Sequence, residues 1–173
     1  MFGLTPLGVI HTAASLVAIV AAIVAFARHK EISMRQRAGQ AYIAATVITC
    51  LTGFGIFRHG GFGPPHTLGI LTLIALGVAY VAGRGAMGRL SRRIEIIVYT
   101  LTVFFHSVPG VTESLTRLPP EAPIAASQEA PIFPVIYGIS FVMFLAGVTL
   151  QIRWLKEQGG LHADWDEEHR PAA

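Results

Sequence analysis

The sequence predicts an all-α integral membrane bundle with five transmembrane helices, and three observations support this fold class. Of the 173 residues, 53% are apolar and only 13% are Asp, Glu, Lys or Arg, which is about half the charged fraction of a soluble domain. The mean hydropathy is +0.57. Long apolar runs end at basic residues, and none alternates in polarity as the strands of a membrane barrel do. This composition excludes a soluble enzyme, a disordered chain and, with Cys50 as the one cysteine, a disulfide scaffold.

The first two predicted helices cover residues 4–27 and 38–57, and they end at Arg28 and Arg58. A span needs about 20 apolar residues, because the hydrocarbon core is about 30 Å thick and a helix rises 1.5 Å per residue. The first run has no basic segment before it and is long for a signal peptide. We therefore expect it to remain in the mature chain as a span.

The remaining predicted helices cover residues 66–83, 94–112 and 134–152. The first of these three is short for a span, so we expect it to stand nearly upright in the bilayer. Proline recurs in the long connection before the last helix, which predicts an irregular segment there. Residues 1–156 then form one transmembrane domain, and residues 157–173 form a polar cytoplasmic tail.

Two charged residues predict that the fourth helix continues past the membrane boundary. Glu113 and Arg117 are four apart, in the orientation that favours an ion pair on a helix. The helix should then reach Leu118 and stop before Pro119, because proline cannot continue it.

The distribution of basic residues predicts the orientation of the chain. Eleven of the 13 Lys and Arg residues fall in the first and third connections and the tail, leaving Arg58 and Arg117 on the other side. Cytoplasmic loops carry the excess of Lys and Arg, so the N-terminus should lie outside and the C-terminus in the cytoplasm. The basic pI of about 9.4 reflects this asymmetry. We therefore expect the lipid bilayer and a membrane partner protein as partners, and no nucleic acid.

Four histidines are expected in the outer half of the membrane. His11 and His106 each lie seven residues from the outer end of their spans, which places both about 10 Å deep. His59 and His66 flank the short outer turn. Ionisable groups inside a bilayer are expensive and mark functional sites or wet cavities. These histidines are therefore the candidate site.

The first interpretation of the site is a b-type haem. His11 and His106 would ligate the iron between the first and fourth helices, as bis-histidine ligation on facing helices requires. Arg58, His59 or His66 would then meet the propionates. The protein would transfer electrons in the membrane and exchange them with quinone.

Other interpretations remain open. The outer pocket could bind a quinone or lipid head group without haem, or His11, His66, His106 and Glu113 could bind a metal ion, since imidazole suits zinc, copper, iron or nickel. In a structural interpretation His11 and His106 only bond between helices, and the chain is a non-enzymatic membrane subunit. The sequence has no GxSxG, CxxC or HExxH signature, so it leaves enzymatic activity open.

Two sequence stretches carry a resemblance to a known family. The segment Arg37–Tyr42 (RAGQAY), then Gly61–Leu68 (GFGPPHTL) and the apolar run after it, resemble a family of predicted bacterial multi-pass membrane proteins, catalogued as a domain of unknown function. Its members carry a His in the first helix, matched by His11, and one at the start of the third span, matched by His66. The resemblance covers about residues 4–118. It implies a location in the bacterial inner membrane and supplies no activity.

Overall fold

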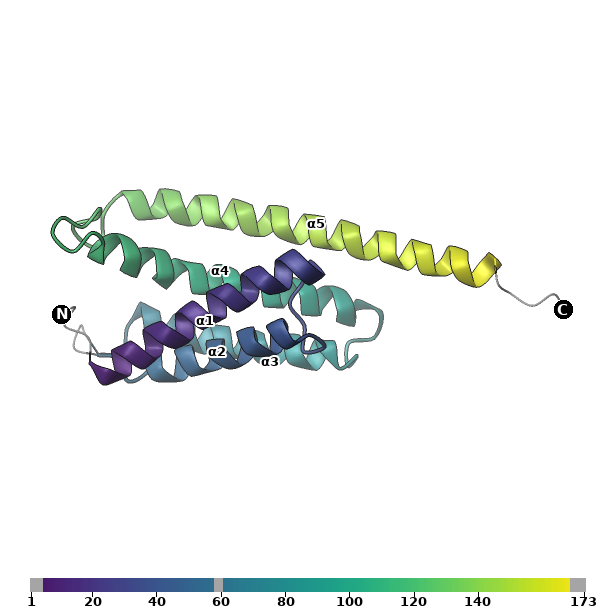
Figure 1. Ribbon diagram of the computed structural model, residues 1–173, viewed down its shortest axis with the longest axis horizontal. Helices are drawn as coiled ribbons and strands as arrows, with labels where there is room; N and C mark the ends of the chain where they lie inside the picture. Colours follow the sequence, from purple (N-terminus) through teal and green to yellow (C-terminus); the bar gives the residue numbers. More distant parts are fainter. Residues whose placement is uncertain (1–4, 58–60, 169–173) are drawn as a thin grey trace.

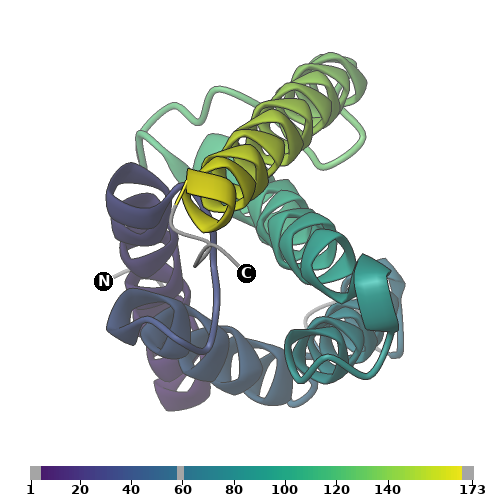
Figure 2. The ribbon, with the colours of Figure 1, turned by 90° about the vertical axis from the view of Figure 1, so that its right-hand side faces the viewer.

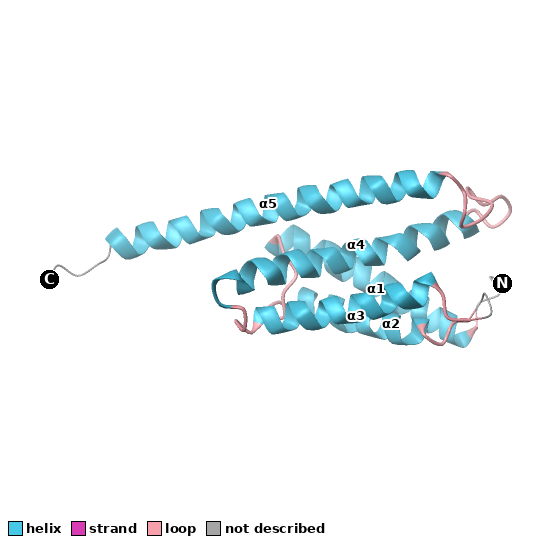
Figure 3. Ribbon diagram, turned by 180° about the vertical axis from the view of Figure 1, so that it is seen from behind, coloured by secondary structure: helices cyan, strands magenta, loops and turns pink. Residues whose placement is uncertain are grey.

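The structure, a computed structural model, describes residues 5–57 and 61–168, and their side chains as far as residue 159. Within these residues the chain is helical and has no strand (Figure 3). The elements in chain order are α1 (Pro6–His29), α2 (Arg37–Gly53), α3 (Pro64–Gly83), the short 3-10 helix η1 (Gly88–Leu90), α4 (Ser91–Arg117) and α5 (Ile132–Glu168). The predicted all-α class is confirmed.

Local chemistry sets both ends of α1. The hydroxyl of Thr5 accepts the N–H of Gly8 at 3.1 Å, and Pro6 occupies the first helical position, where its missing N–H and fixed φ are favourable. The helix ends where Lys30 turns to the left-handed region with φ 63°, and its N–H bonds to the carbonyl oxygen of Phe26. α1 therefore begins and ends two residues later than predicted.

α2 is shorter than the predicted span of residues 38–57. It has 17 residues and ends at Gly53, so it is about 25 Å long and falls short of the hydrocarbon thickness. Beyond its end the N–H groups of Gly55 and Ile56 make turn bonds to the carbonyl oxygens of Thr52 and Gly53. Glycine weakens a helix because its backbone loses more conformational entropy on folding. A prediction from the pattern of apolar residues takes no account of this effect. A crossing by α2 stays a prediction.

In the part of the chain that the structure describes, four helices are long and apolar enough to cross a membrane, namely α1, α3, α4 together with η1, and α5. Their outward faces carry large apolar side chains, and Leu16, Val20 and Ile74 are each more than half exposed. Water would oppose this exposure, whereas lipid does not. The chain is a helical membrane protein.

Small residues allow α1 to pack closely on its neighbours. Ala18, Ala22 and Ala25 are buried along one face of α1, beside Tyr42 of α2 and Tyr99 of α4. α1 packs on α2, α2 on α3 and α3 on α4, and α1 also contacts α4. The end-on view shows the helices in this arrangement (Figure 2). The contact between α1 and α4 brings the first and fourth helices together at the candidate site.

The last two helices extend beyond their predicted spans. α4 continues past its predicted span to Arg117, as the charge pattern predicts. Glu113 forms the predicted ion pair with Arg117. α5 has 37 residues and continues through the predicted tail to Glu168. It lies along α4 and projects well past the other helices (Figure 1).

Candidate functional site

His11 reaches from α1 to α2. Its Nδ1 lies 3.0 Å from the carbonyl oxygen of Thr49 and 3.3 Å from Oγ1 of Thr52. The ring rests against Gly53, where an added Cβ would come within 3.3 Å of Cε1. Because a carbonyl oxygen only accepts, Nδ1 carries the proton and Nε2 of the neutral ring keeps a lone pair. α2 thus fixes the ring and leaves one nitrogen as an acceptor.

His106 approaches α1 from α4. It is 8% exposed, and its Nε2 lies 2.7 Å from Oγ of Ser15. Ser15 and His11 are four residues apart and so share one face of α1. His106 therefore lies on the side of α1 that carries His11, level with Ser15 and about 6 Å, roughly one helical turn, inward from His11. The two histidines are thus not at the equal depth that the sequence predicts.

His66 lies at the N-terminal end of α3, beside two aromatic rings. Its ring centroid is 5.1 Å from that of Phe57 and 5.0 Å from that of Phe62, and both pairs are stacked. The backbone N–H of Gly63 donates to its Nδ1 at 3.2 Å. The hydrogen bond and ring contacts of His66 are thus made to residues of the connection between α2 and α3, while the hydrogen bonds of His11 and His106 are made between helices.

Two further predicted site residues, Arg58 and His59, lie outside the described residues. Glu113 is paired with Arg117 on α4 and does not join the histidines in a ligand set. Among the described side chains, those of residues 5–57 and 61–159, no group of three or more His, Cys, Asp or Glu is placed to hold a metal ion. The geometry therefore gives no support to a metal site built from several protein ligands.

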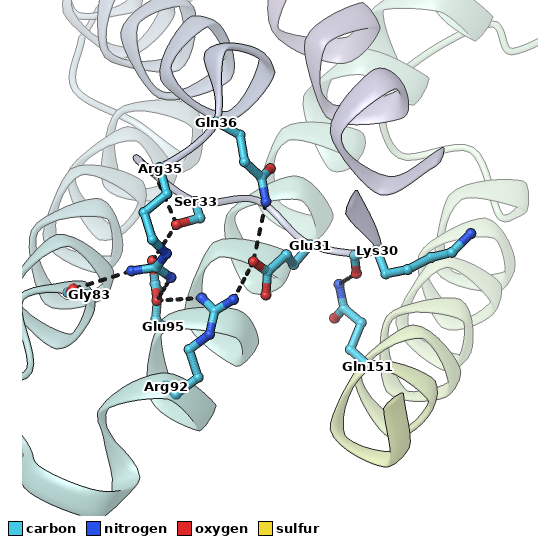
Figure 4. Close-up of polar contacts among 9 residues, drawn as sticks. All are labelled: Lys30, Glu31, Ser33, Arg35, Gln36, Gly83, Arg92, Glu95 and Gln151. Atoms are coloured by element: carbon cyan, nitrogen blue, oxygen red, sulfur yellow. Dashed lines mark hydrogen bonds and ion pairs between the residues drawn. The ribbon is translucent and has the colours of Figure 1, made fainter. Parts of the chain in front are cut away.

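A second polar site, which we call the loop cluster, lies where the connection between α1 and α2 meets α4 (Figure 4). It consists of Glu31, Ser33, Arg35, Arg92 and Glu95. Glu31 is 3% exposed and Glu95 is 1% exposed. Buried carboxylates are costly unless donors surround them, so the partners of these two residues decide how the loop is held.

Glu95 is the better satisfied of the two carboxylates. It accepts from Oγ of Ser33 at 2.9 Å, from Nη2 of Arg35 at 2.5 Å and from Nη1 of Arg92 at 2.8 Å. Nη2 of Arg92 also donates to Oε1 of Glu31. Two carboxylates thus meet two guanidinium groups, and the formal charge of the loop cluster cancels.

Glu31 is bonded through one oxygen. Its Oε1 accepts from Arg92 and also from Nε2 of Gln36 at 3.2 Å, while Oε2 is buried and has no hydrogen-bond partner. Neutralising Glu31 therefore weakens fewer hydrogen bonds than neutralising Glu95 does.

α3 and α5 complete the surroundings of the loop cluster. Gly83 of α3 leaves room for the carboxylate of Glu95, since an added Cβ at Gly83 would come within 2.9 Å of Oε1 of Glu95. Gln151 of α5 donates from Nε2 to the carbonyl oxygen of Lys30 at 2.8 Å and accepts from Oγ1 of Thr100 at 2.8 Å. One end of the bundle is therefore bound together by side chains of α4, α5 and the loop between α1 and α2, with the backbone of α3 at Gly83.

Comparisons with known proteins supply no relative for this chain. No family model, no curated protein and no solved structure matches it. The function is therefore inferred from the sequence and from the contacts of the histidines and of the loop cluster.

Sequence reasoning did not identify the loop cluster. It gave neither Glu95 nor Glu31 a role. One signal was present, because Arg92 and Glu95 are three residues apart, a spacing at which opposite charges pair on a helix. The pairing with Glu31 has no such signal, since 61 residues separate it from Arg92.

The two polar sites differ in what they can do chemically. Both described guanidinium groups of the loop cluster are paired with carboxylates, which suits a structural role. His11 and His66, by contrast, each have Nδ1 held by a hydrogen bond, and the other nitrogen of His66 has no hydrogen-bond partner among the described residues. The histidines are therefore the better candidate for binding a ligand.

Proposed function

We propose that this chain is a multi-pass protein of the bacterial inner membrane that binds a b-type haem through His11 and His106 and transfers electrons through it. The excess of basic residues on one side supports a cytoplasmic C-terminus and an external N-terminus. The resemblance over residues 4–118 supports the bacterial inner membrane. The proposed orientation supports a position in the outer half of the bilayer for His11, near the start of α1, and for His106, in the second half of α4.

The contact between His106 and Ser15 is the observation that carries the haem proposal. It sets an imidazole of α4 against the face of α1 that also bears His11. Haem iron in helical bundles is held by side chains on facing helices. His106 of α4 contacts the side of α1 that bears His11, which supports ligation from these two helices, while the ring of His11 is itself bonded to α2.

The hydrogen bonds of the two rings suit iron ligation to different degrees. His11 donates from Nδ1 to a backbone carbonyl and keeps the lone pair on Nε2, which is how ligating histidines are usually oriented. Nε2 of His106 is bonded to Oγ of Ser15. A serine in a helix can turn its hydroxyl to the carbonyl four residues back, here that of His11, and this rotation frees Nε2 of His106 for iron.

An absorption spectrum of the purified protein tests the proposal. We expect protein from haem-replete cells to show a Soret band that shifts on reduction, with one haem per chain by the pyridine haemochrome assay. His11→Ala and His106→Ala should each lose the band, because each removes one axial ligand. Ser15→Ala should keep it, because the serine hydroxyl is not a ligand.

The control is His29→Ala, since His29 is an exposed histidine at the other end of the same helix. It should leave the spectrum unchanged. Circular dichroism of every variant shows whether the helices are retained. A colourless wild-type protein would overturn the haem proposal and favour the alternative in which both histidines only link helices in a non-enzymatic membrane subunit.

Cysteine labelling tests the proposed orientation. In a Cys50→Ala background, Gln128→Cys places a thiol in the loop before α5, and Arg89→Cys places one in η1, both at exposed positions. A membrane-impermeant maleimide should label the first in intact spheroplasts and the second only after permeabilisation. The reverse pattern would overturn the orientation.

A further inference from the structure

The connection between α3 and α4 carries basic side chains that form no ion pair within the described residues. We call Arg84, Arg89 and Arg93 the basic connection, and all three are exposed. The nearest carboxylate along the chain, that of Glu95, is buried and already bonded within the loop cluster. None of the three arginines therefore has its charge balanced by a described carboxylate.

Two of these arginines are close enough along one helical stretch to repel each other. η1 runs directly into α4, so Arg89 and Arg93 are four residues apart on that stretch. Like charges at this spacing are unfavourable, and the first turn of a helix, where Arg93 lies, is itself unfavourable for a positive charge. An anion bound between the two guanidinium groups would relieve both effects.

Exposed apolar side chains lie beside these charges. Met87 is 37% exposed and Leu90 is 54% exposed, and both belong to the same connection. At the end of α3, Nη1 of Arg84 donates to the hydroxyl of Tyr80 at 3.2 Å, and its guanidinium lies 6.0 Å from the centroid of that ring. Tyr80 is 45% exposed, and such tyrosines are typical of the membrane–water interface. The basic connection therefore lies at the level of lipid head groups.

We propose that the basic connection binds the phosphate of an anionic phospholipid. The guanidinium groups of Arg89 and Arg93 donate to the phosphate oxygens, for which their planar fork is suited, and the acyl chains lie against Leu90. A soluble anion would use the charges alone, whereas a phospholipid also covers the exposed apolar side chains. This combination favours a lipid as the occupant.

The proposed orientation puts the basic connection on the cytoplasmic side of the membrane, and in that respect the lipid site rests on the proposed function. The contacts of the site do not involve His11 or His106. In detergent the binding of a lipid also does not depend on orientation. Lipid binding, haem binding and orientation are therefore three separate measurements, and each can fail without the others.

Native mass spectrometry of the purified protein in detergent tests the site. The protein is titrated with dioleoylphosphatidylglycerol and, separately, with dioleoylphosphatidylcholine, which has the same acyl chains and no net charge. We expect the wild type to bind the anionic lipid more tightly. Arg89→Gln combined with Arg93→Gln should remove most of this preference, by about fivefold for each arginine, which is the effect of one basic residue near an anionic membrane surface.

The matched control combines Arg28→Gln with Arg37→Gln. Both are exposed arginines at the same end of the bundle, and the charge lost is the same, so the preference should stay close to that of the wild type. All four substituted side chains are exposed, and circular dichroism shows whether each variant keeps its helices.

Three results would overturn the lipid site. Equal affinity of the wild type for the two lipids would show that the basic connection does not select an anion. Equal losses in the two double variants would show that only the total charge of this end matters. Displacement of dioleoylphosphatidylglycerol by equimolar inorganic phosphate would identify a soluble anion as the occupant. A colourless wild type that still prefers the anionic lipid would support the lipid site and overturn the haem proposal alone.

Discussion

Arg92 bridges two buried carboxylates that lie far apart in the sequence. Its Nη1 donates to Oε2 of Glu95 at 2.8 Å on the same helix, and its Nη2 donates to Glu31 in the loop after α1. The side chains of both carboxylates are at most 4% exposed. This one guanidinium therefore binds the end of α1 to the beginning of α4.

Arg92→Met should destabilise the protein by roughly 3 kcal/mol. The substitution keeps most of the side-chain volume but leaves two buried carboxylates short of a donor, and breaking a buried ion pair costs about that much or more. The measurement is the free energy of unfolding in mixed micelles titrated with SDS. Arg93→Met is the control, because Arg93 is exposed on the same turn and the charge lost is the same. Equal effects of the two substitutions would show that net charge matters and the bridge does not.

The two carboxylates of the loop cluster should differ in their response to neutralisation. Glu95→Gln introduces an amide NH₂ among three donors, so it should lower the free energy of unfolding by about 2 kcal/mol. Glu31→Gln can place its NH₂ at the position of Oε2, which has no partner, and should cost about half as much. The same SDS titration measures both variants. An equal or larger loss from Glu31→Gln would contradict the bonding described here.

The sequence predicted the helices better than their ends. Apolar runs and basic stops located all five, because these signals are local. The early end of α2 at Gly53 was not predicted, since hydropathy takes no account of backbone entropy. The extension of α5 to Glu168 was missed because its polar part was treated only as a tail. The ion pair of Glu113 with Arg117 was predicted because its partners share one helix.

The candidate site was predicted only in part for a related reason. Hydropathy shows that His11 and His106 lie within apolar helices, but not which neighbours their rings contact. Ser15 and Thr49 gave no signal of their own, because Ser and Thr are ordinary residues of membrane helices. The burial of Glu31 depends on a long-range contact with Arg92, and one sequence without relatives carries no trace of such a contact.

Gly39→Ala should destabilise the loop cluster from outside it. An added Cβ at Gly39 would overlap the carbonyl oxygen of Ser33, and Ser33 is fully buried with its hydroxyl on Glu95. Moving backbone to relieve such an overlap typically costs 1–3 kcal/mol, and we expect about 2 kcal/mol. Thermal unfolding in detergent measures the change.

Gly77→Ala is the matched control for this substitution. Gly77 also lies within a helix, but an added Cβ there has no heavy atom within 4 Å. Alanine favours helix over glycine, so the unfolding temperature should stay the same or rise slightly. A comparable drop in both variants would mean that helix context, and not the overlap with Ser33, sets the effect.

Tyr42 and Thr102 should be energetically coupled across α2 and α4. Their hydroxyl oxygens are 2.8 Å apart and both residues are fully buried. Oγ1 of Thr102 also donates to the carbonyl oxygen of Tyr99, so the tyrosine hydroxyl is the donor of the shared bond. Hydrogen bonds between membrane helices contribute about 0.6 kcal/mol on average and up to about 1.7 kcal/mol.

A double-mutant cycle with Tyr42→Phe, Thr102→Val and the double variant, measured by SDS titration, should give a coupling free energy of about 1 kcal/mol. Additive losses would show that the two side chains act only through packing, and α2 would then be held to α4 without this bond.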